Sequence, residues 1–146
     1  MLVRAIAAFL ICPGTVAFLV PLLIVWPPER SLRPAGWMLL AIGSVLLLWC
    51  VRDFYVVGRG TLAPWAPPKR LLRVGLYRLS RNPMYMAVVI VLGGWAIGFQ
   101  SSVLWLYAAV VGAAFHLRVV LAEEPWLART HGAEWARYKA RVRRWV

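Results

Sequence analysis

The chain has 146 residues, of which 62% are hydrophobic and 15% are charged. This composition excludes a disordered chain and argues against a soluble enzyme, since soluble domains are about half apolar and a quarter charged. The net charge of +12 would suggest a nucleic-acid partner, but with a mean hydropathy of +0.71 it indicates a membrane protein whose basic residues lie at one interface, and no nucleic-acid partner is expected.

Two apolar stretches open the chain. The first, 5–26, is uncharged and too long for the core of a signal peptide, so we expect a retained transmembrane helix. Pro13 and Pro21 lie inside it, and because each proline removes a backbone hydrogen bond, a kink is expected. A polar break at 27–34 follows, and the second span is expected at 35–57.

A helical hairpin is expected next, after a basic, proline-containing segment at 58–83. The sequence then carries no Lys, Arg, Asp or Glu until Arg118, which is too long a run for one span and suits two. The polar turn at 100–102 divides it into spans at 84–99 and 103–121. Each arm would be roughly 25 Å long, at about 1.5 Å per residue.

The remaining residues, 122–146, form a basic tail. Trp135, Tyr138, Val142 and Trp145 follow one another at helical spacing, which predicts an amphipathic helix lying on the membrane surface. The same pattern would suit a helix packed on protein. The predicted architecture is therefore an all-α integral membrane protein of about four transmembrane helices with an interfacial C-terminal helix, forming a single domain over 1–146.

The distribution of Lys and Arg predicts the orientation. The segments 58–83 and 122–146 carry six each, the break at 27–34 carries two and the turn at 100–102 none. Because basic residues favour the cytoplasmic side, a multi-pass topology with both termini in the cytoplasm is expected. The twelve residues are Arg59, Lys69, Arg70, Arg73, Arg78, Arg81, Arg129, Arg137, Lys139, Arg141, Arg143 and Arg144.

Small residues are expected to pack the hairpin. A turn centred near Ser101 places Gly94 opposite Ala108. Gly94 with Gly98, and Ala108 with Gly112, form pairs of small residues four apart, which let helices approach closely in lipid. Packing between the two arms is the favoured interpretation, and dimerisation is the alternative.

The same register collects ionisable and polar groups at the cytoplasmic end of the hairpin. Such groups at membrane depth are costly and indicate a functional site. The alternative is an Arg–Glu pair that only anchors the hairpin at the interface. The residues brought together are Arg81, Asn82, Tyr85, His116, Arg118, Glu123 and Glu124.

Other motif classes give no signal. Cys12 and Cys50 both lie in apolar runs, without the cysteine or histidine neighbours that a disulfide framework or a metal site needs. The sequence contains no P-loop, no G-x-S-x-G and no H-E-x-x-H.

A series of short motifs follows, in order, over residues 58–146. They are the stretch 60–68, then Gly75-Leu76-Tyr77-Arg78, Arg81-Asn82-Pro83-Met84-Tyr85, Glu123-Glu124-Pro125-Trp126-Leu127, and His131-Gly132-Ala133-Glu134-Trp135 with Tyr138. In these motifs the chain resembles the isoprenylcysteine carboxyl methyltransferase family. The related phospholipid N-methyltransferases share the Arg-x-Pro-x-Tyr and Glu-Glu elements.

The resemblance implies an integral-membrane enzyme that uses S-adenosylmethionine, bound in a cytoplasm-facing pocket without a Rossmann domain. Arg81 suits a carboxylate, of either the cofactor or the acceptor, and Glu123 or Glu124 suits the cofactor's ammonium or ribose hydroxyls. Arg81 and Glu123 are the expected catalytic residues. The full set expected at the cofactor is Tyr77, Arg81, Asn82, Pro83, Tyr85, His116, Glu123 and Glu124.

The chain departs from the family pattern at three positions. Asn82 stands where many members have His, Ala87 where they have Gly, and His131 where Phe is usual. Asn82 takes an ionisable group away from the site but keeps a hydrogen-bond donor. The departures at Asn82 and Ala87 motivate one alternative, a non-catalytic membrane scaffold on the same fold.

The acceptor is expected to be lipidic or a small hydrophobic molecule, because the site would open at the bilayer. Methylation of a carboxylate is the leading hypothesis, and a carboxylate needs no base. The alternative is a phosphatidylethanolamine N-methyltransferase, in which a glutamate would have to remove the amine's proton.

Overall fold

The computed structural model describes residues 10–26, 33–58 and 71–145, with side chains from residue 13 onward. All regular elements of the described residues are helices, and one isolated bridge joins Ser80 and Arg143, so the predicted all-α class is confirmed for this part. The elements are η1 (Leu10–Leu19), α2 (Val20–Ile24), α3 (Pro34–Val56), η2 (Gly75–Arg78), α4 (Pro83–Phe99), α5 (Ser102–Arg118), η3 (Val119–Glu123) and α6 (Glu124–Arg141).

Several sequence-based predictions fall outside the described residues. They are the start of the first span at 5–9, most of the polar break at 27–32, and 59–70, which holds the motif at 60–68.

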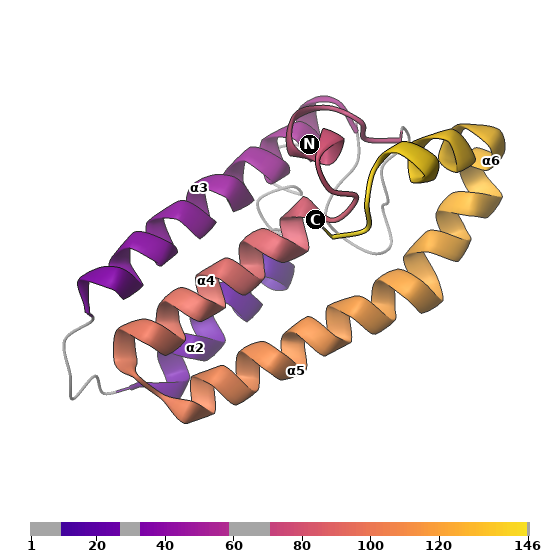
Figure 1. Ribbon diagram of the computed structural model, residues 1–146. Helices are drawn as coiled ribbons and strands as arrows, with labels where there is room; N and C mark the ends of the chain where they lie inside the picture. Colours follow the sequence, from indigo (N-terminus) through magenta and orange to yellow (C-terminus); the bar gives the residue numbers. More distant parts are fainter. Residues whose placement is uncertain (1–9, 27–32, 59–70, 146) are drawn as a thin grey trace.

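The long helices lie side by side, with α4 between α3 and α5 (Figure 1). Successive helices run in opposite directions, so the end of α3, the start of α4 and the end of α5 meet near α6. At the other end a tight turn joins α4 to α5. Gln100 takes a left-handed conformation there (φ 50°), and the Ser101 hydroxyl caps α5 by accepting from the backbone N–H of Leu104.

Two of the described helices are long and apolar enough to cross a bilayer, Pro34–Val56 and the helix that begins at Ser102. The helices Pro13–Ile24 and Pro83–Phe99 are apolar but shorter. Large apolar side chains on the outer faces of α3 and α5, among them Val45, Leu48 and Leu106, are more than half exposed. Such extended apolar surface suits contact with lipid. The four-span topology remains a prediction.

The helix does not end at 121, where the last span was predicted to end, and the limits of that span stay a prediction. The helix continues from α5 through η3 into α6 as far as Arg141, with one kink at Gly132 (φ 44°). α6 is the predicted tail helix, and it buries Trp135 and Tyr138. Val142 is extended (φ −120°, ψ 128°), so Val142 and Trp145 lie beyond the predicted helical face.

Both π-helical stretches end two residues before a proline. η1 ends at Leu19, before Pro21, and η3 ends at Glu123, before Pro125. A proline in a helix lacks the N–H that bonds the carbonyl four residues earlier, and its ring clashes with that carbonyl. The wider π-helical turn accommodates the proline without ending the helix. The kink expected in the first span therefore takes the form of a π-helical segment.

Two side chains from the hairpin replace the hydrogen bonds that Pro21 cannot make. The Trp95 indole N–H donates to the carbonyl of Ala17 at 3.0 Å, and the Tyr107 hydroxyl donates to the carbonyl of Val16 at 3.0 Å. These are the carbonyls four and five residues before Pro21. Inside a bilayer no water could satisfy them, so these bonds fix η1 against α4 and α5.

Replacing Tyr107 with phenylalanine should lower the free energy of unfolding by about 0.6–1.7 kcal/mol, because it leaves the carbonyl of Val16 without this donor. Thermal unfolding of the detergent-solubilised protein measures the change. Tyr55→Phe is the control, since Tyr55 is 37% exposed on α3, and it should melt like the wild type. Equal melting of both variants would contradict the assigned role of Tyr107.

The favoured interpretation of the hairpin glycines is wrong for Gly94 and Gly98. Both pack against α3 and not against α5: a Cβ on Gly36 would lie 2.4 Å from the Cα of Gly98, and one on Gly94 would lie 2.8 Å from the backbone nitrogen of Leu40. A Cβ on Gly112 would meet only the side chain of Val89 in α4, at 4.0 Å. The closest backbone approach is thus between α3 and α4.

Candidate functional site

The start of α4 and the beginning of α6 meet at two glutamates. The Tyr85 hydroxyl, in the first turn of α4, donates to Glu123. Arg118, at the end of α5, donates from Nε to Glu123 Oε1 at 2.8 Å. Pro83 occupies the first position of α4, as predicted, where its missing N–H costs nothing.

Glu124 is the centre of a second, more buried group. Arg81 Nη1 lies 2.8 Å from Glu124 Oε1, and their side chains are 9% and 11% exposed. Arg144 forms a two-pronged contact with the same carboxylate, with Nε 2.8 Å from Oε1 and Nη2 3.0 Å from Oε2. One carboxylate therefore joins three parts of the chain: the segment before α4, the start of α6 and the segment after α6.

Residues 142–145 return along the segment before α4. The backbone N–H of Arg81 donates to the carbonyl of Arg143 at 2.9 Å. The carbonyl of Arg144 accepts from the Ser80 hydroxyl at 3.2 Å and from the Asn82 side-chain amide at 3.0 Å. These bonds end the helical path of the tail and place Arg144 beside Glu124.

Aromatic rings contact the side chains that bind the two glutamates. The Arg81 guanidinium lies 5.5 Å from the centre of the Trp135 ring, within cation–π range. The Tyr85 and Phe115 rings stack with centroids 4.4 Å apart. His116 is exposed and stacks on Trp145 at 6.0 Å.

Electrostatics keep Glu124 ionised. Burial by itself would raise the pKa of Glu124, but the hydrogen bond from Arg144 and the charges of Arg81, Arg144 and Lys139 outweigh it, so the pKa is lowered. Across the site, three guanidinium groups (Arg81, Arg118 and Arg144) face two carboxylates, and one positive charge remains unbalanced among these five side chains.

One hydrogen-bond donor of Arg81 is unpaired within the described structure. Its Nε is buried and has no hydrogen-bond partner in the described part of the chain. A buried charged donor without an acceptor is costly and points to a missing anionic group. The zwitterionic amino-acid end of S-adenosylmethionine fits this donor set, because its carboxylate can accept from Arg81 and its ammonium can approach a glutamate.

The structure gathers most of the predicted site residues but not all of them. Arg81, Asn82, Tyr85, Glu123 and Glu124 lie in the two connected groups. The side chain of Tyr77 instead packs in an apolar cluster with Cys50 and Leu72, and its carbonyl accepts from the Tyr138 hydroxyl at 2.6 Å. His116 stacks on the ring of Trp145, the residue that follows Arg144.

Sequence reasoning missed Arg144 as a partner of Glu124. It had placed this arginine in the amphipathic tail, but the chain leaves the helix three residues earlier, after Arg141. Helical periodicity carries no signal for it, because the carbonyl of Arg144 is held by Ser80 and Asn82, which lie 64 and 62 residues earlier in the chain.

Comparison with known proteins decides the family. A family model described as phospholipid methyltransferase matches residues 32–134. The chain belongs to the phospholipid methyltransferase family. An uncharacterized protein of Haemophilus influenzae is 30% identical over 63 residues, which are 43% of this chain and the whole of that protein. No solved structure matches the chain.

The phospholipid methyltransferase region extends from the start of α3 into α6. It includes both glutamates and the Arg-x-Pro-x-Tyr motif at 81–85, and it stops before Arg144. The isoprenylcysteine carboxyl methyltransferases share this family, so the resemblance seen in the motifs is confirmed at that level. Membership makes a membrane methyltransferase the general class of this protein.

Proposed function

We propose that the protein is an S-adenosylmethionine-dependent membrane methyltransferase that methylates a carboxylate on a lipidic or small hydrophobic acceptor. The observation that carries the proposal is the buried Nε of Arg81, which has no hydrogen-bond partner among the described residues and lies beside the ionised Glu124. Family membership supports the reaction class, and the apolar exterior of α3 and α5 supports an acceptor that arrives through the bilayer.

Each side chain has a part in holding the reactants. Arg81 would bind a carboxylate through paired, charge-assisted hydrogen bonds, and the cation–π contact with Trp135 fixes its plane. Glu123 would accept from the cofactor's ammonium or ribose hydroxyls, and Tyr85 orients that carboxylate. When bound, S-adenosylmethionine supplies a methyl group activated by its sulfonium. The protein's task is then alignment and exclusion of water, and alignment can supply about 7–11 kcal/mol.

The hydrogen bonds and ion pairs of Glu123 and Glu124 favour a carboxylate acceptor over an amine. An amine must lose a proton before it can accept the methyl group, so it needs a base. Glu124 has a lowered pKa, which makes it a poor base, and the carboxylate of Glu123 already accepts from Arg118 and Tyr85. A carboxylate needs no base. Amine methylation, as in phosphatidylethanolamine, is the second candidate, and the family description favours it.

Two measurements test the proposal. Calorimetric titration of the purified protein in detergent should show saturable binding of S-adenosylmethionine, and Arg81→Ala and Glu123→Ala should each weaken it at least tenfold. Arg129→Ala, an exposed arginine on α6, should leave the affinity unchanged. Arg81→Lys keeps the charge and controls for folding. Unchanged affinity in both alanine variants would disprove the site assignment.

The second measurement identifies the acceptor. A lipid extract is incubated with the protein and methyl-labelled cofactor. Label released by mild base indicates a methyl ester and supports the proposal, whereas label in phosphatidylethanolamine derivatives supports the amine reaction. Failure to bind the cofactor at millimolar concentration would overturn both and leave the scaffold hypothesis.

A further inference from the structure

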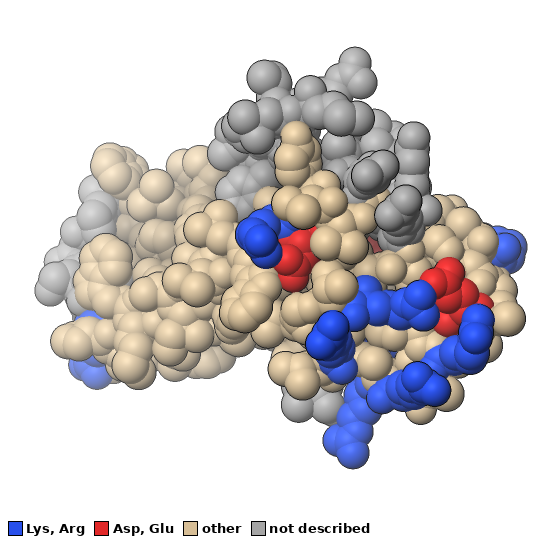
Figure 2. All heavy atoms as spheres, turned by 90° about the horizontal axis from the view of Figure 1, so that it is seen from above, with Lys and Arg blue, Asp and Glu red and all other residues tan. Residues whose placement is uncertain are grey.

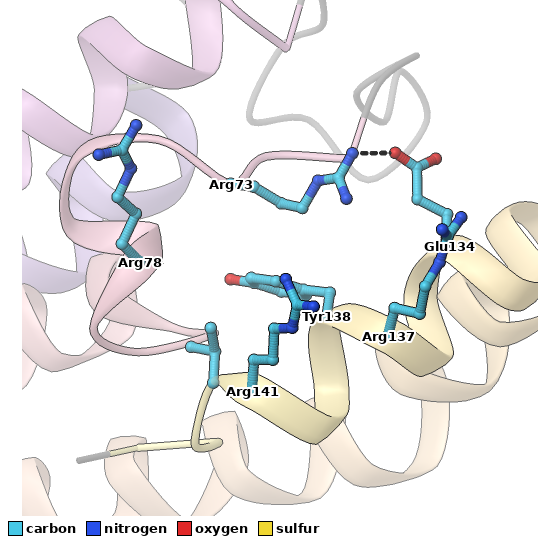
Figure 3. Close-up of a pocket in the computed structure, with 7 residues that line it drawn as sticks. Arg73, Arg78, Glu134, Arg137, Tyr138 and Arg141 are labelled. Atoms are coloured by element: carbon cyan, nitrogen blue, oxygen red, sulfur yellow. Dashed lines mark hydrogen bonds and ion pairs between the residues drawn. The ribbon is translucent and has the colours of Figure 1, made fainter.

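A cavity of about 480 Å³ lies between the segment before α4 and the last turns of α6. It is within the range of small-molecule sites, about 300–1,000 Å³. Four arginines and one glutamate line it together with Tyr138, and Figure 3 shows Arg78 on one side of the Tyr138 ring and Arg137 on the other. None of Arg81, Glu123 and Glu124 lines it, so this is a second location.

A buried hydrogen bond joins the two segments that line the cavity. The Tyr138 hydroxyl donates to the carbonyl of Tyr77 at 2.6 Å and so ties α6 to η2. Burial raises the pKa of Tyr138 to about 12, although the charges of Arg81 and Arg73 oppose the shift. The phenol is therefore neutral and does not balance the arginines around it.

The charges around the cavity are unbalanced. Arg73 is paired with Glu134 across the opening. Arg78, Arg137 and Arg141 form no ion pair with any residue that the structure describes, and the Nε of Arg137 donates only to the backbone carbonyl of Ala133, at 3.4 Å. Arg137 and Arg141 are also four residues apart on one helix, an arrangement in which like charges repel and destabilise the helix. An anion in the cavity would relieve this repulsion.

The surface around the cavity is also rich in basic side chains. Figure 2 shows Lys and Arg side chains gathered at the α6 end of the face it draws, with few acidic side chains among them. This end of the bundle is where α3 ends and α4 begins, at the boundary of the apolar helices. Basic pockets at this level of a membrane protein suit the phosphates of lipid headgroups.

We propose that the cavity lined by Arg73, Arg78, Arg137 and Arg141 is a binding site for a phosphate group, carried by an anionic lipid headgroup or by a soluble phosphate. The planar guanidinium fork matches phosphate oxygens in pairs. Three arginines that form no ion pair within the described ranges suit a group with more than one negative charge. The site goes beyond the methyl-transfer function and does not depend on it.

Binding is tested on the full-length protein in uncharged detergent, without cofactor, by calorimetric titration. The probes are dioctanoyl phosphatidic acid, dioctanoylglycerol, which has the same chains without a phosphate, and inorganic phosphate. We expect saturable binding of phosphatidic acid and none of dioctanoylglycerol. Inorganic phosphate binding as tightly as the lipid would assign the site to a soluble ligand, and weaker binding would assign it to a headgroup.

Two double variants locate the site. Arg137→Gln with Arg141→Gln removes two cavity arginines and should weaken phosphate binding by about tenfold or more, because the charge-assisted hydrogen bonds of both guanidinium groups are lost. Arg129→Gln with Lys139→Gln removes the same charge from α6 outside the cavity and should bind like the wild type. Without ligand, the double variant of Arg137 and Arg141 should melt no lower than the wild type, because the repulsion between these two like charges is removed.

Three results would overturn the proposal. They are equal binding of dioctanoylglycerol, unchanged affinity in the cavity variant, and an equal loss in both double variants, which would mean a diffuse charge effect. Because the cofactor is absent throughout, the result is independent of whether the protein transfers methyl groups.

Discussion

Glu124→Ala should lower the free energy of unfolding by about 3–5 kcal/mol, one of the two largest effects expected in the chain. The loss leaves two guanidinium groups, Arg81 and Arg144, without their carboxylate, and Arg81 is only 9% exposed. An uncompensated charge at a buried site costs far more than the pair contributes. Chemical or thermal unfolding in detergent measures the change.

Glu134→Ala is the matched control. Glu134 also pairs with an arginine, Arg73, but the side chains are 47% and 40% exposed for arginine and glutamate. Water screens such a pair, so its removal should cost only about 0–1 kcal/mol. Equal costs for the two variants would show that Glu124 is not the centre of a buried charge network.

The pH dependence of stability provides a second readout for Glu124. Its pKa is lower in the folded chain than the ordinary value of 4.5. Its contribution to stability is therefore complete above that value and is lost as the pH falls through the folded-state pKa. Glu124→Gln should make the decline below pH 4.5 shallower than in the wild type.

Gly36→Ala should have the second large effect, lowering the free energy of unfolding by about 1–3 kcal/mol. The added methyl would lie 2.4 Å from the Cα of Gly98 and 2.8 Å from the carbonyl oxygen of Gly94. Both contacts are backbone atoms that cannot rotate away, so α3 and α4 must separate. Thermal unfolding and the yield of monodisperse protein measure the effect.

Gly93→Ala should change stability in the opposite direction. A Cβ at Gly93 meets nothing within 4 Å in the described structure, and alanine restricts the unfolded chain more than glycine does. We expect a gain of about 0.4–1 kcal/mol. If Gly36→Ala melted as high as Gly93→Ala, the close approach of α3 and α4 would be refuted.

The helix boundaries that the sequence predicts well are those marked by proline. The second span was expected at 35–57 and α3 is Pro34–Val56, while the third was expected at 84–99 and α4 is Pro83–Phe99. Here an apolar run begins at a residue that lacks an N–H, so composition and helix chemistry agree. The hairpin register also placed Tyr85 and Arg81 near the glutamates that they contact.

The sequence-based predictions differ from the structure mainly where segments far apart in the chain interact. Nothing around residue 121 forces a helix to end, because η3 absorbs Pro125 and the first residue with a non-helical conformation is Gly132. The predicted register pairs only the two arms of the hairpin, α4 and α5, so it could not assign Gly94 to α3. Helical spacing continued past Arg141, whereas the carbonyls of Arg143 and Arg144 bond the segment before α4.

The return of residues 142–145 to the segment before α4 determines the order in which the protein can assemble. Arg81 and Glu124 are 43 residues apart, and Asn82 and Arg144 are 62 apart. The hairpin of α4 and α5 uses local contacts and can form as soon as both helices have been inserted. The complete charge network around Glu124 cannot form until Arg144, 20 residues further along the chain, has been synthesised.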